Sequence, residues 1–273
     1  EAAGVEAADV DVVISMTEEY KEYPVWTAGI KLAHDLGAVN AYAYDIGQKC
    51  GTGVLALKQA RDLLRADPHV DTVLVAGGYR NGDLVDYADP NVRFMYSLGA
   101  GAAAAVVQRD ATKNRILEAA VRTDGSFSLD VLVPVGGTVE PVNAGNAEDF
   151  RLQVPDPQGM KERLEQKSLD NFVAVVEEAV ARSGHATGDI DYLAMLHVKP
   201  SAHRYLLERL GLREEQSVYL RDYGHIGQVD QFLSLQLAQE QGLLRQGDLV
   251  VLVAAGVGYV WNALCLRWGE DRE

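Results

Sequence analysis

Short apolar runs bounded by turn residues indicate buried strands in the first part of the chain. Three such runs cover residues 11–16, 73–78 and 102–107, and runs of this length are typical of strands covered on both faces. Between the first two, residues 54–64 carry apolar side chains at helical spacing. The alternation of strand and helix predicts a βαβ architecture with a mixed or largely parallel sheet.

The second part of the chain repeats this pattern. The matched pairs of segments are 11–16 with 191–196, 32–37 with 206–211, 45–47 with 222–224 and 73–78 with 251–256. Because the matches keep the same order and a nearly constant offset, they predict a duplicated α/β fold. We expect two similar halves, residues 1–125 and 126–273, with equivalent loops meeting in one crevice where strand ends face helix starts.

The composition favours a soluble protein with a hydrophobic core and argues against a membrane protein or a nucleic-acid-binding protein. The 273 residues are 48% hydrophobic, which is enough to bury a substantial core. Apolar runs of about 18 residues and the features of a signal peptide are absent, so the sequence predicts a soluble, cytoplasmic protein. A net charge of -15 argues against binding of nucleic acid or of an anionic membrane. An anionic partner would need a local basic patch.

The two cysteines occur in different contexts, and we interpret both as thiols. Cys50 lies in the loop 45–53 directly before a helix, where the helix dipole is expected to lower the thiol pKa. Gly51 and Gly53 would let a substrate carbonyl approach the backbone N–H groups. Cys50 is therefore a candidate nucleophile, with a buried structural cysteine as the alternative. Cys265 lies in an apolar strand pattern and is interpreted as structural.

Two histidines could assist a thiolate. His197 follows a strand end, and His225 lies in the loop equivalent to that of Cys50. An imidazole can balance the thiolate charge and move protons, although either histidine could also be a structural loop residue. The remaining histidines, His203 among them, are expected on surfaces or helix faces. The segment 256–258 is either a tight turn or a source of a backbone N–H for the substrate oxygen.

These residues together resemble the thiolase superfamily, specifically its β-ketoacyl-acyl carrier protein synthase III branch. The resemblance covers essentially the whole chain and is strongest at 45–53, 223–225, 256–261 and the His197 loop. It implies a five-layered α-β-α-β-α fold, a homodimer, and an acyl-coenzyme A or acyl-carrier protein donor that loads Cys50. It also implies an oxyanion hole made by the backbone N–H groups of Cys50 and Val257, with no cofactor and no metal ion.

The chain departs from the family pattern at several points. Members that decarboxylate a malonyl thioester normally have asparagine in place of His225. The segment 224–231 resembles a subgroup that transfers the acyl group to a hydroxyl or amine of a natural product, in which Asp230 could orient His225 or His197. The alternative is that Asp230 caps the following helix. Residues 97–101 read Ser-Leu-Gly-Ala-Gly where the family has Gly-Asp-Gly-Ala-Gly.

The resemblance carries further expectations. Family members have additional strands and a helix before residues 8–10, so part of the first half is expected to be missing. Tyr23 aligns with an aromatic position that reaches into the partner's acyl pocket, which suggests a short or polar acyl group. Lys199, Arg204 and Arg209 form a candidate docking cluster for a carrier protein or coenzyme phosphates, or else an ordinary solvated helix face. 

The sequence thus predicts a two-stage acyl transfer through a Cys50 thioester, with His197 and His225 in proton transfer. The acyl group would pass to a malonyl thioester by decarboxylative condensation, or alternatively to a hydroxyl or amine. A non-catalytic partner of a condensing enzyme would lack Cys50. A thiolase would need a second crevice cysteine, which Cys265 does not supply, and a hydroxymethylglutaryl-type synthase would need a catalytic glutamate, for which the sequence alone suggests no position.

Overall fold

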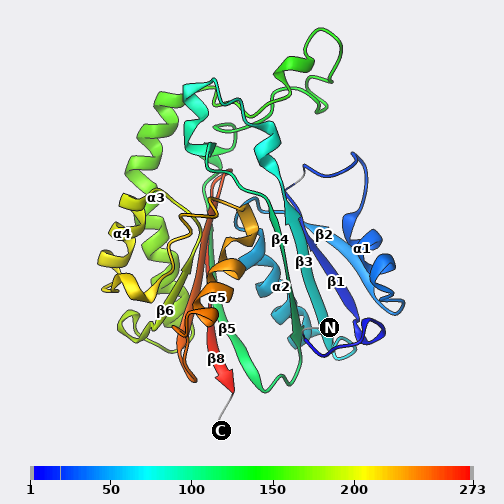
Figure 1. The fold of residues 1–273 in the computed structure, drawn as a ribbon, viewed down its shortest axis with the longest axis vertical. Coiled ribbons are helices and arrows are strands. Elements are labelled where there is room, and N and C mark those ends of the chain that lie inside the picture. The colour runs from blue at the N-terminus through cyan, green and yellow to red at the C-terminus, as the bar shows by residue number, and fades with distance from the viewer. Residues whose placement is uncertain (1–2, 19, 271–273) are drawn as a thin grey trace.

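The computed structural model describes residues 3–18 and 20–270, and it contains helices and strands in the predicted alternation (Figure 1). The strands are β1 (Val12–Met16), β2 (Tyr42–Ile46), β3 (Thr72–Tyr79), β4 (Gly101–Gln108), β5 (Lys113–Thr123), β6 (Tyr192–Met195), β7 (Leu249–Gly256) and β8 (Val260–Glu270). The α-helices are α1 (Ala28–Leu36), α2 (Thr52–Ala66), α3 (Pro157–Arg182), α4 (Pro200–Arg209) and α5 (Asp230–Glu240).

Within the described residues, the strands form two sheets of four. The first has the order β2-β1-β3-β4, with β1 parallel to both neighbours and β4 antiparallel to β3. The second has the order β5-β8-β7-β6, with β6 parallel to β7 and β8 antiparallel to β7 and β5. The strands β1, β3 and β4 therefore correspond to β6, β7 and β8, which is the duplication that the sequence predicts.

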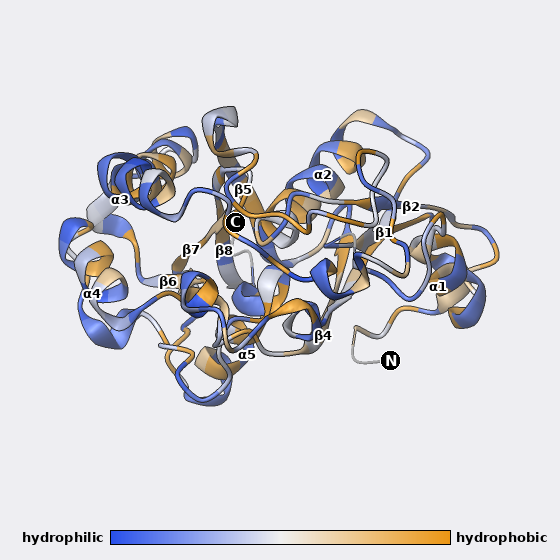
Figure 2. Cartoon of the chain, turned by 90° about the horizontal axis from the view of Figure 1, so that it is seen from above, coloured by the Kyte–Doolittle hydropathy of each residue, from blue (hydrophilic) through white to orange (hydrophobic). Residues whose placement is uncertain are grey.

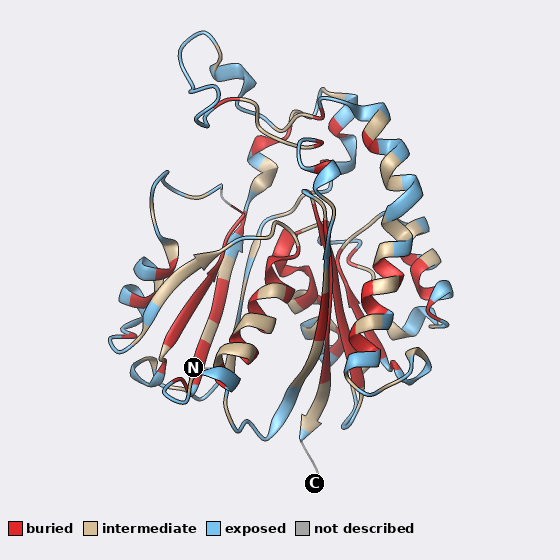
Figure 3. Ribbon diagram, turned by 180° about the vertical axis from the view of Figure 1, so that it is seen from behind, coloured by how far each residue is buried: buried red, intermediate tan, exposed pale blue. Residues whose placement is uncertain are grey.

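The helices and sheets stack in five layers, as expected. Helix α1 covers the outer face of the first sheet, α3 and α4 lie outside the second sheet, and α2 and α5 lie between the two sheets (Figures 1 and 2). The central helix α2 is largely buried, whereas the outer helices expose one side (Figure 3). Apolar residues occupy both faces of the central strands because both faces are covered.

Strand β7 illustrates how the pattern builds the core. All eight of its residues are buried. Leu249 and Val251 pack into the cluster with α3 and α4, whereas Val250 and Leu252 pack into the cluster with α2 and α5. Because successive side chains of a strand point to opposite faces, one continuous apolar run supplies two layers of core.

The last strand of the expected first half joins the second sheet. Strand β5 lies before the predicted boundary at residue 125, yet its hydrogen bonds place it in the second sheet beside β8. The chain therefore changes sheets between Gln108 and Lys113. Strand β5 covers the outer edge of β8, whereas no described strand pairs with the equivalent edge of β4.

The structure also bears on the question of a membrane span. No helix formed by residues 3–18 or 20–270 is both long and apolar enough to cross a bilayer.

Candidate active site

Cys50 lies in a tight turn between β2 and α2. Its neighbour Lys49 has a φ of 51°, in the left-handed region that non-glycine residues seldom adopt. The Thr52 hydroxyl closes the turn, because it accepts a hydrogen bond from the Gln48 N–H at 2.7 Å and donates one to the Lys49 carbonyl at 2.5 Å. The turn thus holds the thiol at the start of α2.

Hydrogen bonds from Asn262 connect this turn to the second sheet. The buried Asn262 side chain, on β8, donates to Gln48 Oε1 at 2.8 Å and to the Gly51 carbonyl at 2.9 Å. A Cβ on Gly51 would lie 2.8 Å from Asn262 Nδ2, and a Cβ on Gly53 would lie 2.4 Å from the Gln228 carbonyl oxygen. The two glycines therefore allow the halves of the protein to pack closely. Protein atoms occupy the space that a Cβ would take at either glycine.

His225 approaches Cys50 from the loop before α5, the counterpart of the Cys50 loop. Its Nε2 lies 3.1 Å from Cys50 Sγ. The His225 N–H donates to the Ser97 carbonyl at 2.8 Å, and the Gly99 N–H donates to the His225 carbonyl at 2.8 Å. The segment that departs from the family pattern therefore holds the His225 backbone in place.

Asp230 orients the His225 ring. Its buried carboxylate accepts hydrogen bonds from His225 Nδ1 at 2.6 Å, from the His197 backbone N–H at 2.7 Å and from the Ile226 backbone N–H at 2.7 Å. The N-cap of α5 is Val229, which makes no side-chain capping bond, and Asp230 is the first residue of the helix. The interpretation of Asp230 as a helix cap alone is therefore wrong, because its carboxylate points back to the two histidine loops.

Burial and charge set the protonation of this group of residues. Burial, the largest single effect at His225, favours the neutral ring, but the negative charges of Cys50 and Asp230 together raise its pKa well above its ordinary value. Burial raises the pKa of the Cys50 thiol, and the attraction of His225 opposes this increase. The expected lowering of the thiol pKa is wrong in direction, since burial outweighs the favourable contacts. The thiolate therefore forms together with protonated His225, as a pair.

His197 lies beside this group without joining it. Its ring stacks on Tyr219 with a centroid separation of 5.3 Å, and its Nε2 lies 3.4 Å from the Tyr219 hydroxyl oxygen. In the part of the chain that the structure describes, no hydrogen bond joins this ring to Cys50. Burial lowers the pKa of His197, so the ring is neutral at pH 7. His203, expected on a surface or a helix face, lies on α4 and is buried against Tyr219.

The end of β7 meets the backbone of the Cys50 turn. A Cβ on Gly256 would lie 2.9 Å from Cys50 N and 3.0 Å from the Gln48 carbonyl oxygen. Only a residue without a side chain permits this approach. The segment that contains Val257 therefore lies next to the Cys50 turn. The backbone N–H groups of Cys50 and Val257 are the two that were expected to form an oxyanion hole.

The other predicted residues lie farther from the thiol. Tyr23, between β1 and α1, is 67% exposed and contacts Trp26 edge-on. Lys199 and Arg204 are exposed at the start of α4, directly after the His197 loop. Arg209 lies at the opposite end of α4, where it donates to the Tyr205 hydroxyl at 2.8 Å.

Glu18 is a candidate that the sequence reasoning missed. It lies two residues beyond the C-terminal end of β1 and is only 7% exposed. Its negative charge raises the pKa values of the Cys50 thiol and, together with stronger burial, of Tyr79. A charged residue two positions after a buried strand was the signal in the sequence that could have indicated it.

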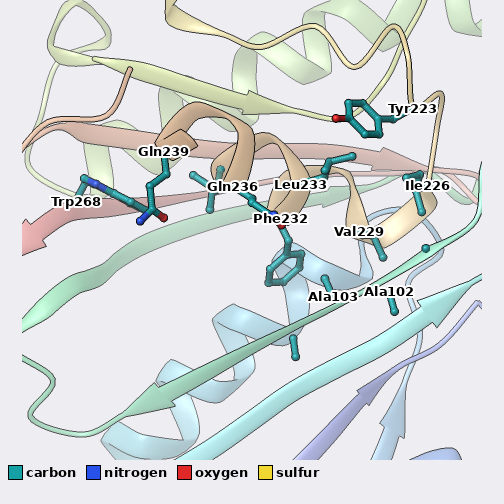
Figure 4. Close-up of a pocket in the computed structure, with 13 residues that line it drawn as sticks. Ala102, Ala103, Tyr223, Ile226, Val229, Phe232, Leu233, Gln236, Gln239 and Trp268 are labelled. Atoms are coloured by element: carbon teal, nitrogen blue, oxygen red, sulfur yellow. The ribbon is translucent and has the colours of Figure 1, made fainter. Parts of the chain in front are cut away.

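A groove beside this site is lined by neither Cys50, His225 nor Asp230. It has a volume of about 520 Å³ and lies between α5 and the unpaired edge of β4 (Figure 4). Ala102, Ala103, Ile226, Phe232 and Leu233 contribute to its mainly apolar lining. The groove follows from the unpaired edge of β4 and is separate from the Cys50 chemistry.

Comparison with known proteins identifies the family. Residues 44–125 match the family of 3-oxoacyl-[acyl-carrier-protein (ACP)] synthase III, and residues 180–268 match the C-terminal domain of the same enzyme. The β-ketoacyl-[acyl-carrier-protein] synthase III of Syntrophomonas wolfei is 29% identical over 100% of this chain and 80% of its own length. That of Allorhizobium ampelinum is 29% identical over 98% of this chain and 80% of its own length.

Solved structures confirm the fold. A crystal structure of 3-oxoacyl-(acyl-carrier-protein) synthase III has a TM-score of 0.84 at 24% identity, covering 98% of this chain and 81% of that chain. A structure named as an acyltransferase has a TM-score of 0.75 at 22% identity, covering 97% of this chain and 79% of that chain. Together with the two matched ranges, which span both halves, these findings show that the chain belongs to the 3-oxoacyl-[acyl-carrier-protein] synthase III family of thiolase-fold acyltransferases.

Proposed function

We propose that this protein carries an acyl group on Cys50 and transfers it to the hydroxyl or amine of a second substrate. The observation that supports this most directly is the connected series of Asp230, His225 and Cys50, joined by contacts of 2.6 Å and 3.1 Å. A carboxylate, an imidazole and a nucleophile in this order form an acyl-transfer triad, in which the histidine can accept a proton.

In the first stage, the Cys50 thiolate attacks the carbonyl carbon of a donor thioester. The negative oxygen of the tetrahedral intermediate would be held by the backbone N–H groups of Cys50 and Val257. The close approach of Gly256 to the Cys50 turn supports this assignment. Protonated His225 gives its proton to the departing donor thiolate. The product is an acyl-Cys50 thioester beside a neutral His225.

In the second stage, the neutral His225 ring acts as general base. Its Nδ1 donates to Asp230, so its Nε2 can accept a proton from the acceptor as the acceptor oxygen or nitrogen attacks the thioester. The C–S bond breaks, and the Cys50 thiolate returns beside protonated His225. Loss of a proton to the enzyme is what a hydroxyl or amine acceptor requires.

Decarboxylative condensation with a malonyl thioester is the second candidate. The names of the relatives favour it, since they are synthases of this kind. This reaction requires hydrogen-bond donors to the thioester enolate, a role that His197 and His225 could fill only with the correct ring nitrogen protonated. The partner of His225 is a carboxylate, which favours proton acceptance at Nε2 instead. We therefore place acyl transfer first.

The donor is proposed to be an acyl-coenzyme A or an acyl-carrier protein. Lys199 and Arg204 are exposed next to the His197 loop, and the positive charges of Arg221 and Arg204 both act on Tyr219. These cations could bind the phosphates of either donor. Arg209 fits this role less well, because about ten residues of helix, or about 15 Å, separate it from Lys199.

We also propose a homodimer in which Tyr23 contacts the acyl site of the second copy. The Tyr23 side chain is 67% exposed, the neighbouring Tyr20 and Val25 are exposed as well, and exposed apolar patches mark interaction sites. Sedimentation would measure the assembly. A Tyr23→Ala variant would then accept longer acyl groups if the ring closes the pocket.

Mass spectrometry of the acyl-enzyme tests the proposed function. The protein is incubated with acetyl- and longer acyl-coenzyme A, the excess donor is removed, and the loaded peptide is mapped. The loaded protein is then given malonyl-carrier protein, a simple alcohol or a simple amine. Discharge by an alcohol or an amine, with an ester or amide product, supports the proposal. Discharge only by malonyl-carrier protein, with release of carbon dioxide, identifies a condensing enzyme and contradicts it.

A further inference from the structure

Tyr79 brings a phenol hydroxyl to the side of the catalytic triad. It is the last residue of β3, which lies between β1 and β4 in the first sheet. Its ring lies 6.2 Å from the His225 ring, and His225 Nε2 in turn lies 3.1 Å from Cys50 Sγ. The Tyr79 side chain is only 6% exposed. Tyr79 is therefore a buried neighbour of the base, and the proposed acyl transfer gives it no role.

The loop before α5 holds the Tyr79 ring in place. A Cβ on Gly227 would lie 2.3 Å from Tyr79 Cε2, so only a residue without a side chain permits this contact. Ile226 packs against the ring in one apolar cluster. The Gln228 side chain donates from Nε2 to the carbonyl of Gly78, the residue before Tyr79, at 2.9 Å. The position of the ring therefore does not depend on its hydroxyl.

The Tyr79 hydroxyl has no hydrogen-bond partner among the residues that the structure describes. Tyr192 shows the usual arrangement for a buried tyrosine. Its hydroxyl oxygen accepts a hydrogen bond from the Val218 N–H at 3.1 Å and lies 2.8 Å from the Ser234 hydroxyl oxygen. Because a buried tyrosine hydroxyl usually has a partner, and an unpaired one is unfavourable, the partner of Tyr79 is expected to come from a substrate.

The surroundings of this hydroxyl indicate what kind of group it can bind. Burial, together with the negative charges of Cys50, Glu18 and Asp230, raises the pKa of Tyr79 far above its ordinary value. The hydroxyl is therefore protonated at pH 7 and can donate a hydrogen bond to an oxygen atom. The same negative charges disfavour a carboxylate at this position. A neutral hydroxyl or keto oxygen fits best.

The acyl group is the part of the substrate that most directly reaches these surroundings, because it is bonded to Cys50 Sγ. Its thioester oxygen is already assigned to the backbone N–H groups of Cys50 and Val257, and His225 Nε2 is assigned to the proton of the acceptor. A further oxygen on the acyl group has no assigned partner. The third carbon is the first position at which such an oxygen is not adjacent to the reacting carbonyl carbon.

On the basis of the acyl-Cys50 intermediate proposed above, we propose that the Tyr79 hydroxyl donates a hydrogen bond to a neutral oxygen on the third carbon of the acyl group. The site then selects 3-hydroxyacyl or 3-oxoacyl groups over unsubstituted ones. An unsubstituted acyl group leaves the hydroxyl buried and unpaired, which is the basis of the discrimination.

Two acyl donors that differ by one hydroxyl test this assignment. Butyryl- and 3-hydroxybutyryl-coenzyme A have the same carbon skeleton, and the latter is used as each enantiomer. Each donor is mixed with the wild type and with Tyr79→Phe, and formation of acyl-Cys50 is followed by rapid quenching and mass spectrometry. We expect the wild type to load one 3-hydroxybutyryl enantiomer about 10-fold faster than butyryl, the size of one hydrogen bond. Tyr79→Phe should load both acyl groups at similar rates.

Stability measurements and a second tyrosine separate substrate binding from a structural role. Tyr79→Phe keeps the ring and removes a hydroxyl that has no protein partner, so its midpoint of urea unfolding should not decrease. Tyr192→Phe removes a hydroxyl with protein partners, so its midpoint should decrease while the acyl preference of the wild type is retained. Discharge of butyryl-Cys50 to an alcohol should be as fast in Tyr79→Phe as in the wild type.

The outcomes also separate this inference from the proposed function. The same acyl preference in the wild type and in Tyr79→Phe overturns the role of Tyr79. Slower discharge of Tyr79→Phe to an alcohol, with the acyl preference unchanged, places the hydroxyl against the acceptor and also overturns it. If the preference depends on Tyr79 but acyl-Cys50 passes to no alcohol or amine, the inference stands and the proposed function fails. If neither acyl group loads Cys50 from coenzyme A or from a carrier protein, both fail.

Discussion

Asp230 Oδ2 lies 2.6 Å from His225 Nδ1, and this contact leaves the other ring nitrogen, Nε2, directed at Cys50. The contact depends on the duplication of the fold. The Cys50 turn precedes α2, and the His225 loop precedes the equivalent helix α5. Because α2 and α5 share the central layer, their starts meet and bring nucleophile and base within 3.1 Å.

Replacing Asp230 with asparagine should impair catalysis more than folding. In Asp230→Asn the side chain remains about the same size but no longer holds the His225 ring as a proton acceptor. We expect discharge of acyl-Cys50 to an amine or alcohol to slow by about 100-fold or more. Single-turnover kinetics would measure this, with Asp222→Asn, exposed in the same loop, as the control. Discharge within a few-fold of the wild type would mean that Asp230 only supports the loops.

The two cysteines should differ sharply in reactivity. Cys265 is fully buried on β8, and burial raises its pKa to about 11. Iodoacetamide at pH 8 should therefore alkylate Cys50, which is paired with His225, and leave Cys265 unmodified in the folded protein. Peptide mapping by mass spectrometry would locate the label.

The matching variants provide the control for this prediction. Cys50→Ala should lose both alkylation and acyl loading, whereas Cys265→Ala should retain both. Comparable labelling of the two cysteines in the folded protein would contradict the difference in environment.

Gly256→Ala should damage the nucleophile turn. The added Cβ would lie 2.9 Å from Cys50 N, a backbone atom that cannot move without displacing the thiol. We expect Cys50 loading to fall by about 100-fold, the size of the effect of a misplacement of about 1 Å at a reacting group. At Gly188 an added Cβ meets nothing within 4 Å, so Gly188→Ala is the matched control. Normal loading of Gly256→Ala would show that the turn tolerates displacement.

His203 should make folding stability depend on pH. Burial, helped by the charges of His197 and Arg204, lowers its pKa from 6.5 to about 4. The unfolded chain therefore takes up a proton as the pH falls below about 6.5, and folded His203 does so only near pH 4. The neutral ring therefore contributes to the free energy of unfolding above pH 6.5. This contribution, up to about 3 kcal/mol, is lost as the pH falls to about 4.

Denaturant unfolding at several pH values would measure this loss. The variant His203→Phe keeps an aromatic ring against Tyr219 and cannot be protonated, so its stability should decrease less between pH 6.5 and pH 4. The same decrease in both proteins would assign the pH dependence to other groups.

Much of the fold follows from the sequence. The apolar runs at 11–16, 73–78 and 251–256 became the central strands β1, β3 and β7, because fully covered strands need apolar residues on both faces. The repeated order of segments became two matching sheets. The sequence did not predict which sheet β5 joins, because nothing in the pattern of this strand indicates its neighbour.

The sequence by itself determined the kinds of residue in the site: one cysteine before a helix and two loop histidines. Only the tertiary structure decided that His225 contacts Cys50 while His197 stacks on Tyr219, and that Asp230 points back instead of capping its helix. It also placed Asn262 and Gly256 against the Cys50 turn. These contacts join residues up to about two hundred positions apart. Local patterns cannot specify them, because they depend on how the two halves pack.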